Sequence, residues 1–534
     1  MEFDRLGIML DCSRNGVLTV ASVKRYMDIL SKLGYNCLML YTEDTYEVDN
    51  QPFFGYLRGR YSQEELKELD AYAAGKGIEL IPCIQTLAHL NAIVRWNAYK
   101  PFTDTRDILL AEDERTYDLI EDMFASLQKC FTSRIVNIGM DEAHMVGLGK
   151  YLDVHGYQDR FRILTRHLDR VCEIAKKYGF HPIMWSDMFF RLCNNGVYTK
   201  ADPVLPSPEV VAAVPKNVDL VYWNYYSEEK HLIDGMIEAH RVFDNPLWFA
   251  GGFWTWTGYV PKNALSIRRT RLAMASLQEH KIRNAIFTIW GDDGQECSVF
   301  SVLPALYYTA QLAKGVTDEK QIKAGFLQEF GIAFDDFLLL DLPGGAPWAD
   351  GTVGNPDKWL FYSDPFLGFF DTAVPEDPHY DVCAEKLEKL VDAPQFGYLF
   401  RLEAKLCRFL QRKMTLGLRT RAAYQKEDKA QLQTLIAEYE RLSLLLEEFY
   451  QALKDRWYRE NKPFGFEVLD LRIGGLKQRL THCRQRLEDY LAGRLPRLDE
   501  LEEAILPEFA PTVRHDYWCS QVTPGALGMD YVGK

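Results

Sequence analysis

The feature that most constrains the fold is a series of eight short apolar segments before about residue 330, separated by segments with helical periodicity. All eight read as buried on both faces, as parallel strands covered by helices do. We therefore expect an α/β fold, a closed (β/α)8 TIM barrel. An open doubly wound sheet is the alternative, but no GxGxxG motif or phosphate loop supports it. The predicted strands are residues 6–11, 36–43, 78–86, 135–141, 182–187, 218–223, 246–252 and 284–290.

Helical signals fill the intervals between these segments. An apolar face predicts a helix that ends at Gly34, and Ser62 with Glu65 forms a capping-box spacing at the start of another. A long amphipathic pattern covers residues 161–175, whereas the fifth helix is weak and confined to 207–214. The alternation of strand and helix is therefore complete around the predicted barrel.

The rest of the chain predicts an all-α helical C-terminal domain. We divide the sequence into a barrel (1–335), a connecting segment (336–395) rich in Gly, Pro and Asp, a helical domain (396–505) and a C-terminal tail (506–534). The helical domain carries apolar seams at spacings of three and four, which are typical of helix hairpins or a bundle. Packing against the barrel and a helical dimer interface are both open readings of these seams. Their residues are Leu402, Leu406, Phe409, Leu435, Tyr439, Leu442, Leu446, Phe449, Leu453, Leu476, Leu480, Cys483, Leu487 and Tyr490.

Charge and composition limit the partners of the chain. A net charge of −14 argues against a nucleic-acid surface, and no uninterrupted apolar segment reaches membrane-spanning length. The first residues show no basic region, apolar core and cleavage site, so no signal peptide is expected. The 11 cysteines lack CxxC pairs and metal-ligand spacing, which is typical of reduced thiols. We expect a cytoplasmic protein without nucleic-acid or membrane partners.

Acidic and aromatic residues gather where the predicted strands end. In a barrel of this kind, chemistry takes place at the carboxyl ends of the strands. Taken singly, a tryptophan fits core packing, Asp44 fits a helix cap and His89 fits a buried core histidine. Together they suit a sugar, because indole rings stack on its C–H face while carboxylates bind its hydroxyls. The residues at these ends are Asp11, Arg14, Glu43, Asp44, Gln85, His89, Asp141, Glu142, Trp185, Asp187, Trp223, Asn224, Tyr225, Tyr226, Trp254, Trp256, Trp290, Asp292 and Asp293.

The adjacent acids Asp141 and Glu142 end the fourth apolar segment. Two like charges there indicate either a solvated strand end or two groups that share work at a site. A buried acid, a histidine and a second acid would set one another's pKa values. A metal site from His89, Asp44 and Glu142 is not supported by an HExxH motif or clustered histidines, so no metal is expected.

Five motifs carry a resemblance to a known family. MLDCSRN, NCLMLYTED, IPCIQTLAHLNA, NIGMDEAH and IWGDDGQE resemble, in this order, the strand-end motifs of glycoside hydrolase family 20, the β-N-acetylhexosaminidases. The resemblance covers roughly residues 5–315. The helical part, with WLFYSDPFLGFFD and NKPFGFEVLDLRIGGL, is similar to a subgroup whose barrel is followed by an all-helical domain.

The resemblance implies the roles of the site residues. In this family the substrate supplies the nucleophile: its 2-acetamido oxygen attacks the anomeric carbon and forms an oxazolinium ion. Asp141 would orient the acetamido N–H, and Glu142 would act first as acid and then as base. His89 and Asp44 match the pair that supports the acid. The expected substrate-binding residues are Asp11, Arg14, Trp185, Trp223, Tyr225, Trp254, Trp290 and Asp292.

Three departures from the family pattern concern the sugar contacts. The family's HxGGDE reads NIGMDE here. Leu6 occupies the position of an arginine that binds sugar hydroxyls, so Arg5 or Arg14 would have to replace it. The tyrosine that binds the acetamido oxygen is also displaced, which leaves Tyr225 and Tyr226 as candidates.

We therefore predict an exo-β-N-acetylhexosaminidase that removes terminal β-linked GlcNAc, with GalNAc as a second candidate, and needs no cofactor. The partner would be a glycan or glycoconjugate with a terminal N-acetylhexosamine. One alternative is a two-carboxylate retaining glycosidase with Asp187 or Asp292 as nucleophile. Another is a catalytically silent sugar-binding barrel. A homodimer through the helical domain is a further hypothesis. The segment NKPFGFEVLDLR, which contains Arg472, lies either beside the mouth of its own barrel or beside that of a partner.

Overall fold

A closed barrel of eight parallel strands forms the first part of the chain. The computed structural model describes residues 2–292, 294–344, 355–374, 379–506, 518 and 522–523. Asp293 and most of the predicted tail lie outside these residues. All eight predicted strands are confirmed. They are β1 (Arg5–Asp11), β2 (Cys37–Tyr41), β3 (Glu79–Cys83), β4 (Ile135–Asn137), β5 (His181–Trp185), β6 (Asp219–Trp223), β7 (Leu247–Gly252) and β8 (Asn284–Ile289).

Helices surround the barrel, and their ends follow the sequence signals. Gly34 ends α1 in the left-handed conformation at φ 90°, which glycine adopts without steric cost. Ser62 and Glu65 form the predicted capping box of α2, and Ser207 caps the short α8. The helices of this part are α1 (Val20–Leu33), α2 (Gln63–Gly75), α3 (Asn91–Val94), α4 (Glu114–Cys130), α5 (Lys150–His155), α6 (Arg160–Lys177), α7 (Asp187–Arg191), α8 (Pro208–Ala213), α9 (Lys230–His240), α10 (Asn263–His280) and α11 (Leu303–Ala313).

Several strands are shorter than predicted, and the difference shapes the mouth of the barrel. β4 ends at Asn137, four residues before the predicted end at position 141. Gly139, Met140 and Glu142 have φ values of 71°, 72° and 50°, so the chain leaves the extended conformation there. Asp141 and Glu142 therefore lie in a turn and do not point to opposite faces of a strand.

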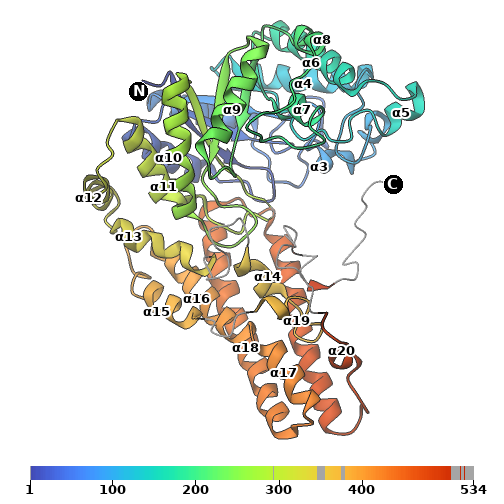
Figure 1. The fold of residues 1–534 in the computed structure, drawn as a ribbon, viewed down its shortest axis with the longest axis vertical. Helices are drawn as coiled ribbons and strands as arrows, with labels where there is room; N and C mark the ends of the chain where they lie inside the picture. The colour runs from blue at the N-terminus through green and yellow to red at the C-terminus, as the bar shows by residue number, and fades with distance from the viewer. Residues whose placement is uncertain are drawn as a thin grey trace.

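A helical region follows the barrel and extends away from it (Figure 1). The predicted seam residues are buried where α16 packs on α18 and α18 packs on α19, except Tyr490, which is partly buried. The predicted connecting segment 336–395 itself contains α14 and α15, and α15 packs on α16. No helix in the described residues is long and apolar enough to cross a membrane. The helices are α12 (Glu319–Phe330), α13 (Phe334–Phe337), α14 (Pro356–Tyr362), α15 (Tyr380–Glu388), α16 (Gly397–Lys413), α17 (Leu416–Gln425), α18 (Lys429–Glu460), α19 (Phe466–Leu491) and α20 (Asp499–Glu502).

Buried polar contacts hold the helical region against the mouth of the barrel. The Asn15 amide donates to the carbonyl of Gly465, at the start of α19, at 2.9 Å. The buried carboxylate of Glu296 lies 2.9 Å from the ammonium of Lys358 and 3.0 Å from the guanidinium of Arg472. Because these contacts join loops after β1 and β8 to α14 and α19, the segment around Arg472 lies beside the mouth of its own chain.

Candidate active site

A cleft of about 700 Å³ opens at the carboxyl ends of the strands. It contains five of the predicted site residues, Arg14, His89, Glu142, Trp254 and Asp292, and α19 closes one side with Val468 and Arg472. The side chains around it are those of Ser13, Arg14, Asn15, Glu43, Arg58, His89, Asn91, Ala92, Arg95, Arg106, Asp107, Glu142, His144, Tyr226, Trp254, Trp256, Thr257, Asp292, Val468 and Arg472.

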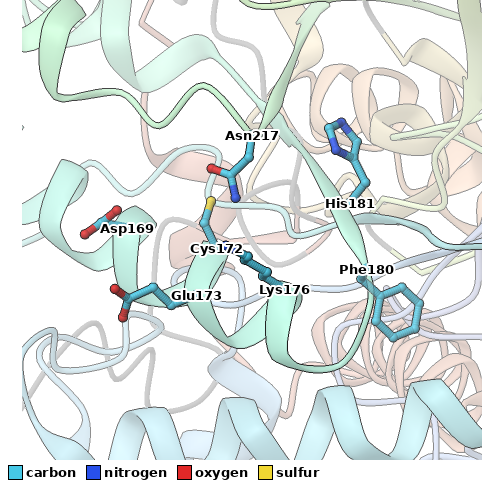
Figure 2. Close-up of a pocket in the computed structure, with 7 residues that line it drawn as sticks. All are labelled: Asp169, Cys172, Glu173, Lys176, Phe180, His181 and Asn217. Carbon is cyan, nitrogen blue, oxygen red and sulfur yellow. The ribbon is translucent and has the colours of Figure 1, made fainter.

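A second hollow, of about 480 Å³, lies at the other end of the barrel. Figure 2 shows Cys172 of α6 beside Asn217; the hollow is also lined by Lys176 of α6 and by His181, the first residue of β5. Because it adjoins the amino ends of β5 and β6, this hollow is remote from the predicted site residues. We place the chemistry in the first cleft.

Asp141 and His89 form a buried ion pair below that cleft. Asp141 Oδ2 lies 3.2 Å from His89 Nε2, and Gln85 Nε2 donates to Asp141 Oδ1 at 2.8 Å. Burial acts to raise the pKa of Asp141, but the charge of His89 and the two contacts outweigh it and hold that pKa below its usual value. Burial disfavours a charged His89, yet Asp141 raises the pKa of His89 to about 9. The pair is therefore ionised at neutral pH.

The backbone around this pair adopts uncommon conformations. His89, Met140 and Glu142 have positive φ values of 57°, 72° and 50°. Gly139 is required beside them, because a Cβ there would lie 2.0 Å from Gln85 Oε1. Such conformations cost of the order of 1–3 kcal/mol each and are found where a site must be held in one geometry.

Glu142 stands on the cleft wall with its carboxylate between two cations. Its Oε2 lies 3.8 Å from His89 Nε2, and its Oε1 lies 3.3 Å from the guanidinium of Arg191. Asp187, which is fully buried, accepts hydrogen bonds from Arg191 Nε at 2.9 Å and from the Glu142 backbone N–H at 3.2 Å. Burial, with repulsion from Asp141 and Glu142, raises the pKa of Asp187 to about 7. Asp187 and Arg191 thus fix both the backbone and the side chain of Glu142.

Arg14 links the opposite acids of the mouth. Its Nε donates to Glu43 at 2.9 Å, and its guanidinium forms an ion pair with Asp292. The guanidinium carbon lies 4.9 Å from the centre of the Trp290 ring. Arg5, the other candidate for the displaced family arginine, instead pairs with Glu79 at the first residue of β3. Of the two arginines that could replace the displaced one, Arg14 is therefore the one that reaches the cleft.

The remaining aromatic candidates pack together under the cleft. Trp223 stacks on Tyr225 with ring centres 5.1 Å apart, and Trp185 lies 6.3 Å from Trp290. All four are at most 9% exposed. Trp254 reaches the cleft, and its indole stacks on Trp256 at 3.9 Å. Trp185, Trp223, Tyr225 and Trp290 thus lie beneath the floor of the cleft, whereas Trp254 and Trp256 form part of its wall.

Two predicted residues act through other groups. The carboxylate of Asp11 accepts hydrogen bonds from the backbone N–H groups of Ser13 and Gly291 at 2.9 Å each, so it joins the loops after β1 and β8. Asp44 is buried and accepts from Arg58 Nε at 3.3 Å. The resemblance pairs Asp44 with His89, whereas the structure places His89 against Asp141 and Glu142.

Sequence reasoning overlooked Arg191, Arg58, Arg95 and Arg106. Arg58 lies on the loop after β2, and Arg95 and Arg106 lie at the end of α3 and on the loop that follows it. Arg191 is the last residue of α7. Arg191 stands four residues after Asp187, the spacing of a helical ion pair, and this signal in the sequence points to it.

The His89–Asp141 pair makes a prediction about pH and stability. The pKa of His89 rises from about 6.5 in the unfolded chain to about 9. Its contribution to stability is therefore complete below about pH 6.5 and is lost as the pH rises to about 9. We expect urea unfolding to show His89→Gln less stable than the parent at pH 6, with the gap narrowing by pH 9. A gap that stays constant over this range would contradict the assignment.

Comparisons with known proteins follow the same division of the chain. A family model described as glycosyl hydrolase family 20, catalytic domain, matches residues 3–232, and one described as glycoside hydrolase 20C C-terminal domain matches residues 335–516. Hexosaminidase D from Bos taurus is 22% identical over 50% of this chain and 73% of its own length. A β-hexosaminidase from Akkermansia muciniphila is 26% identical over 26% of this chain and 34% of its own length. A family 20 exo-β-N-acetylglucosaminidase structure from Vibrio harveyi has a TM-score of 0.47 and 16% identity, covering 64% of this chain and 58% of that chain.

Proposed function

The chain belongs to glycoside hydrolase family 20 and is a β-N-acetylhexosaminidase; we propose that it removes terminal β-linked GlcNAc by substrate-assisted hydrolysis with retention. One observation carries the proposal. His89 lies 3.2 Å from Asp141 and 3.8 Å from Glu142, so a single imidazolium joins two adjacent carboxylates at the mouth of the barrel. This arrangement offers one fixed anion and one acid that faces the cleft.

Asp141 is the group suited to the acetamido side of the sugar. It stays ionised because His89 and Gln85 hold its pKa low against the effect of burial. An ionised carboxylate accepts a hydrogen bond from the acetamido N–H, which turns the amide oxygen toward the anomeric carbon. As that oxygen attacks, positive charge develops on the amide, and the Asp141 carboxylate stabilises it.

Glu142 is the group suited to proton transfer. Its side chain is 40% exposed and lines the cleft, so it can reach the glycosidic oxygen of a bound substrate. It donates a proton to that oxygen as the bond to the anomeric carbon breaks and the oxazolinium ion forms. It then removes a proton from the water that opens this ion at the same carbon, and two inversions give retention.

The aromatic floor and Arg14 are the groups suited to the sugar ring. Trp185, Trp223 and Trp290 lie buried beneath the cleft, and we assign them to the acetamido methyl and the sugar ring as the family resemblance implies. Of the two candidate tyrosines, Tyr225 stacks on Trp223. Burial and, after it, the nearby charge of Asp141 raise the pKa of Tyr225, so this tyrosine lies near the catalytic carboxylate and we assign it to the acetamido oxygen. Arg14 and Asp292 together offer donors and acceptors to the outer hydroxyls.

The two-carboxylate alternative lacks a suitable nucleophile. Asp187 is fully buried, and its carboxylate is already bonded to Arg191 and to the backbone N–H of Glu142. Asp292 lines the cleft but is paired with Arg14. Neither carboxylate is therefore prepared to attack an anomeric carbon.

A panel of p-nitrophenyl β-glycosides tests the function. We expect hydrolysis of the N-acetylglucosaminide, and of the N-acetylgalactosaminide if the axial hydroxyl is accepted, but at least about 1,000-fold slower hydrolysis of the glucoside and galactoside. NMR of the first product should show the β-anomer. Equal rates on the glucoside would support the two-carboxylate mechanism, and no hydrolysis of any member would support a silent sugar-binding barrel.

The location and assembly are part of the same proposal. The ten cysteines in the described residues are unpaired, which supports a cytoplasmic enzyme that acts on a small glycan or glycoconjugate. A homodimer through the helical domain is the assembly we propose; Leu444 on α18 and Leu471 on α19 are 58% and 78% exposed and are the apolar side chains that such an interface would cover. Light scattering of the parent and of a Leu444→Glu/Leu471→Glu variant tests the dimer: loss of the dimer is expected, and an unchanged mass excludes these two side chains from the interface.

A further inference from the structure

The two sides of the cleft differ in chemistry. In the closed strand order, β2 and β3 lie across the barrel from β6 and β7. The cleft residues after β6 and β7 include the aromatic side chains of Tyr226 and Trp254. Those after β2 and β3 include Arg58, Arg95 and Arg106, which we call the arginine rim. The sugar-binding aromatic residues and the arginine rim therefore occupy opposite sides.

Arg58 is held rigidly in this rim. Its Nε donates to the buried Asp44 at 3.3 Å, and its terminal nitrogen donates to the backbone carbonyl of Ser13. These contacts use one edge of the guanidinium and fix its plane beside the cleft. A guanidinium fixed in this way loses little conformational entropy when it binds a further anion.

Arg106 lies on a turn that is tied to the catalytic loop. Asp104, two residues earlier, accepts from the backbone N–H groups of Gly147 at 2.7 Å and Tyr151 at 2.8 Å. The N–H of Leu90, next to His89, donates to the carbonyl of Asp107 at 3.1 Å. The turn is thus fixed relative to His89, and the Arg106 side chain projects from it into solvent.

The charge of the rim is only partly balanced. Glu43, an acid of the same side, is already paired with Arg14. Within the described part of the chain, neither Arg95 nor Arg106 has an ion-pair partner, and both are exposed. Asp107 is the one acid left to oppose them among the described residues around the cleft on this side. The whole chain has a net charge of −14, so this cluster of arginines makes the rim more positive than the average surface of the protein.

We propose that the arginine rim binds an oxyanion, a carboxylate or a sulfate ester, on the sugar that leaves, so that the preferred substrate is an N-acetylhexosamine β-linked to an acidic sugar. Glu142, which meets the glycosidic oxygen, follows β4, the neighbour of β3. A leaving sugar that extends away from the aromatic side therefore passes over the rim. Guanidinium groups bind carboxylate and sulfate through paired hydrogen bonds. This inference rests on the proposed function and names its substrate class.

Two pairs of disaccharides test the inference. GlcNAcβ1→4-glucuronic acid and GlcNAcβ1→4-glucose share the same leaving oxygen and differ at C6 in a carboxylate. GlcNAcβ1→3-galactose with and without a 6-sulfate differ in a sulfate. We expect kcat/KM to be about tenfold higher or more for the charged member of at least one pair, with the preference falling as salt is raised. The pair that shows it identifies the anion.

Variants then assign the preference to the rim. In Arg95→Gln/Arg106→Gln the ratio of kcat/KM between charged and neutral members should fall about tenfold, whereas Arg419→Gln, on the exposed face of the distant α17, should leave the ratio unchanged. Equal kcat/KM within both pairs, or a preference that survives in the double variant, would overturn the inference. If p-nitrophenyl N-acetylglucosaminide is hydrolysed in that case, the proposed function stands and only the anion site is excluded.

Discussion

Replacement of Glu142 by Gln should lower kcat/KM for a disaccharide substrate by about 100- to 10,000-fold. The amide keeps the volume and polarity of the side chain but has no proton to give to the glycosidic oxygen. The loss should shrink for leaving groups that need no protonation, such as 2,4-dinitrophenolate. Steady-state kinetics over a series of aryl leaving groups measures this, with a steeper dependence on leaving-group pKa in Glu142→Gln than in the parent.

The leaving-group series separates loss of the acid from loss of the fold. Misfolding would lower kcat/KM equally for every substrate, whereas loss of the acid spares the best leaving groups. Glu238→Gln, a change on the outer surface of α9, serves as the matched control and should behave as the parent. Disaccharide turnover by Glu142→Gln at the parental rate would show that another group supplies the proton.

Replacement of Asp141 by Asn should lower kcat/KM by about 100- to 1,000-fold for every leaving group. The change removes the charge that stabilises the oxazolinium ion, and an amide NH₂ can face the acetamido N–H. Because Asp141 is what raises the pKa of His89 to about 9, that pKa should also fall toward its usual value. Kinetics and NMR titration of the His89 ring in the same variant measure the two effects.

A control variant keeps this test specific. Asp153→Asn, on the exposed face of α5, also removes one carboxylate and should leave kcat/KM and the His89 titration unchanged. Thermal unfolding of Asp141→Asn should stay cooperative, since the substitution changes charge and not volume. A kcat/KM within about threefold of the parent would show that Asp141 does not stabilise the intermediate.

The barrel and its mouth are predictable from the sequence because both follow from local patterns. The carboxyl ends of parallel strands meet at one edge, so the strand ends taken in order bring Glu142, His89, Arg14 and Asp292 to one cleft, with Asp141 against His89 below it. The apolar seams of the helical region are also predictable from the sequence, since helical spacing alone defines a buried face.

Side-chain direction is not predictable from these patterns. Asp11 ends β1 and Asp44 follows the end of β2 by three residues, but Asp11 turns toward backbone N–H groups and Asp44 toward Arg58. The predicted end of β4 is wrong because Met140 and Glu142 adopt the left-handed backbone conformation, which the residue types in this segment do not reveal. Contacts between distant segments, such as Glu296 with Arg472, depend on the tertiary packing of the helical region.

The most direct test of the account varies the nucleophile itself. A series of p-nitrophenyl β-glucosaminides with acetyl, fluoroacetyl, difluoroacetyl and trifluoroacetyl groups on N2 makes the amide oxygen progressively less basic while the leaving group stays the same. If that oxygen attacks the anomeric carbon, kcat/KM should fall steeply with each fluorine, by about 1,000-fold or more across the series. A kcat/KM that is independent of fluorination, as expected for attack by an enzyme carboxylate, would contradict it.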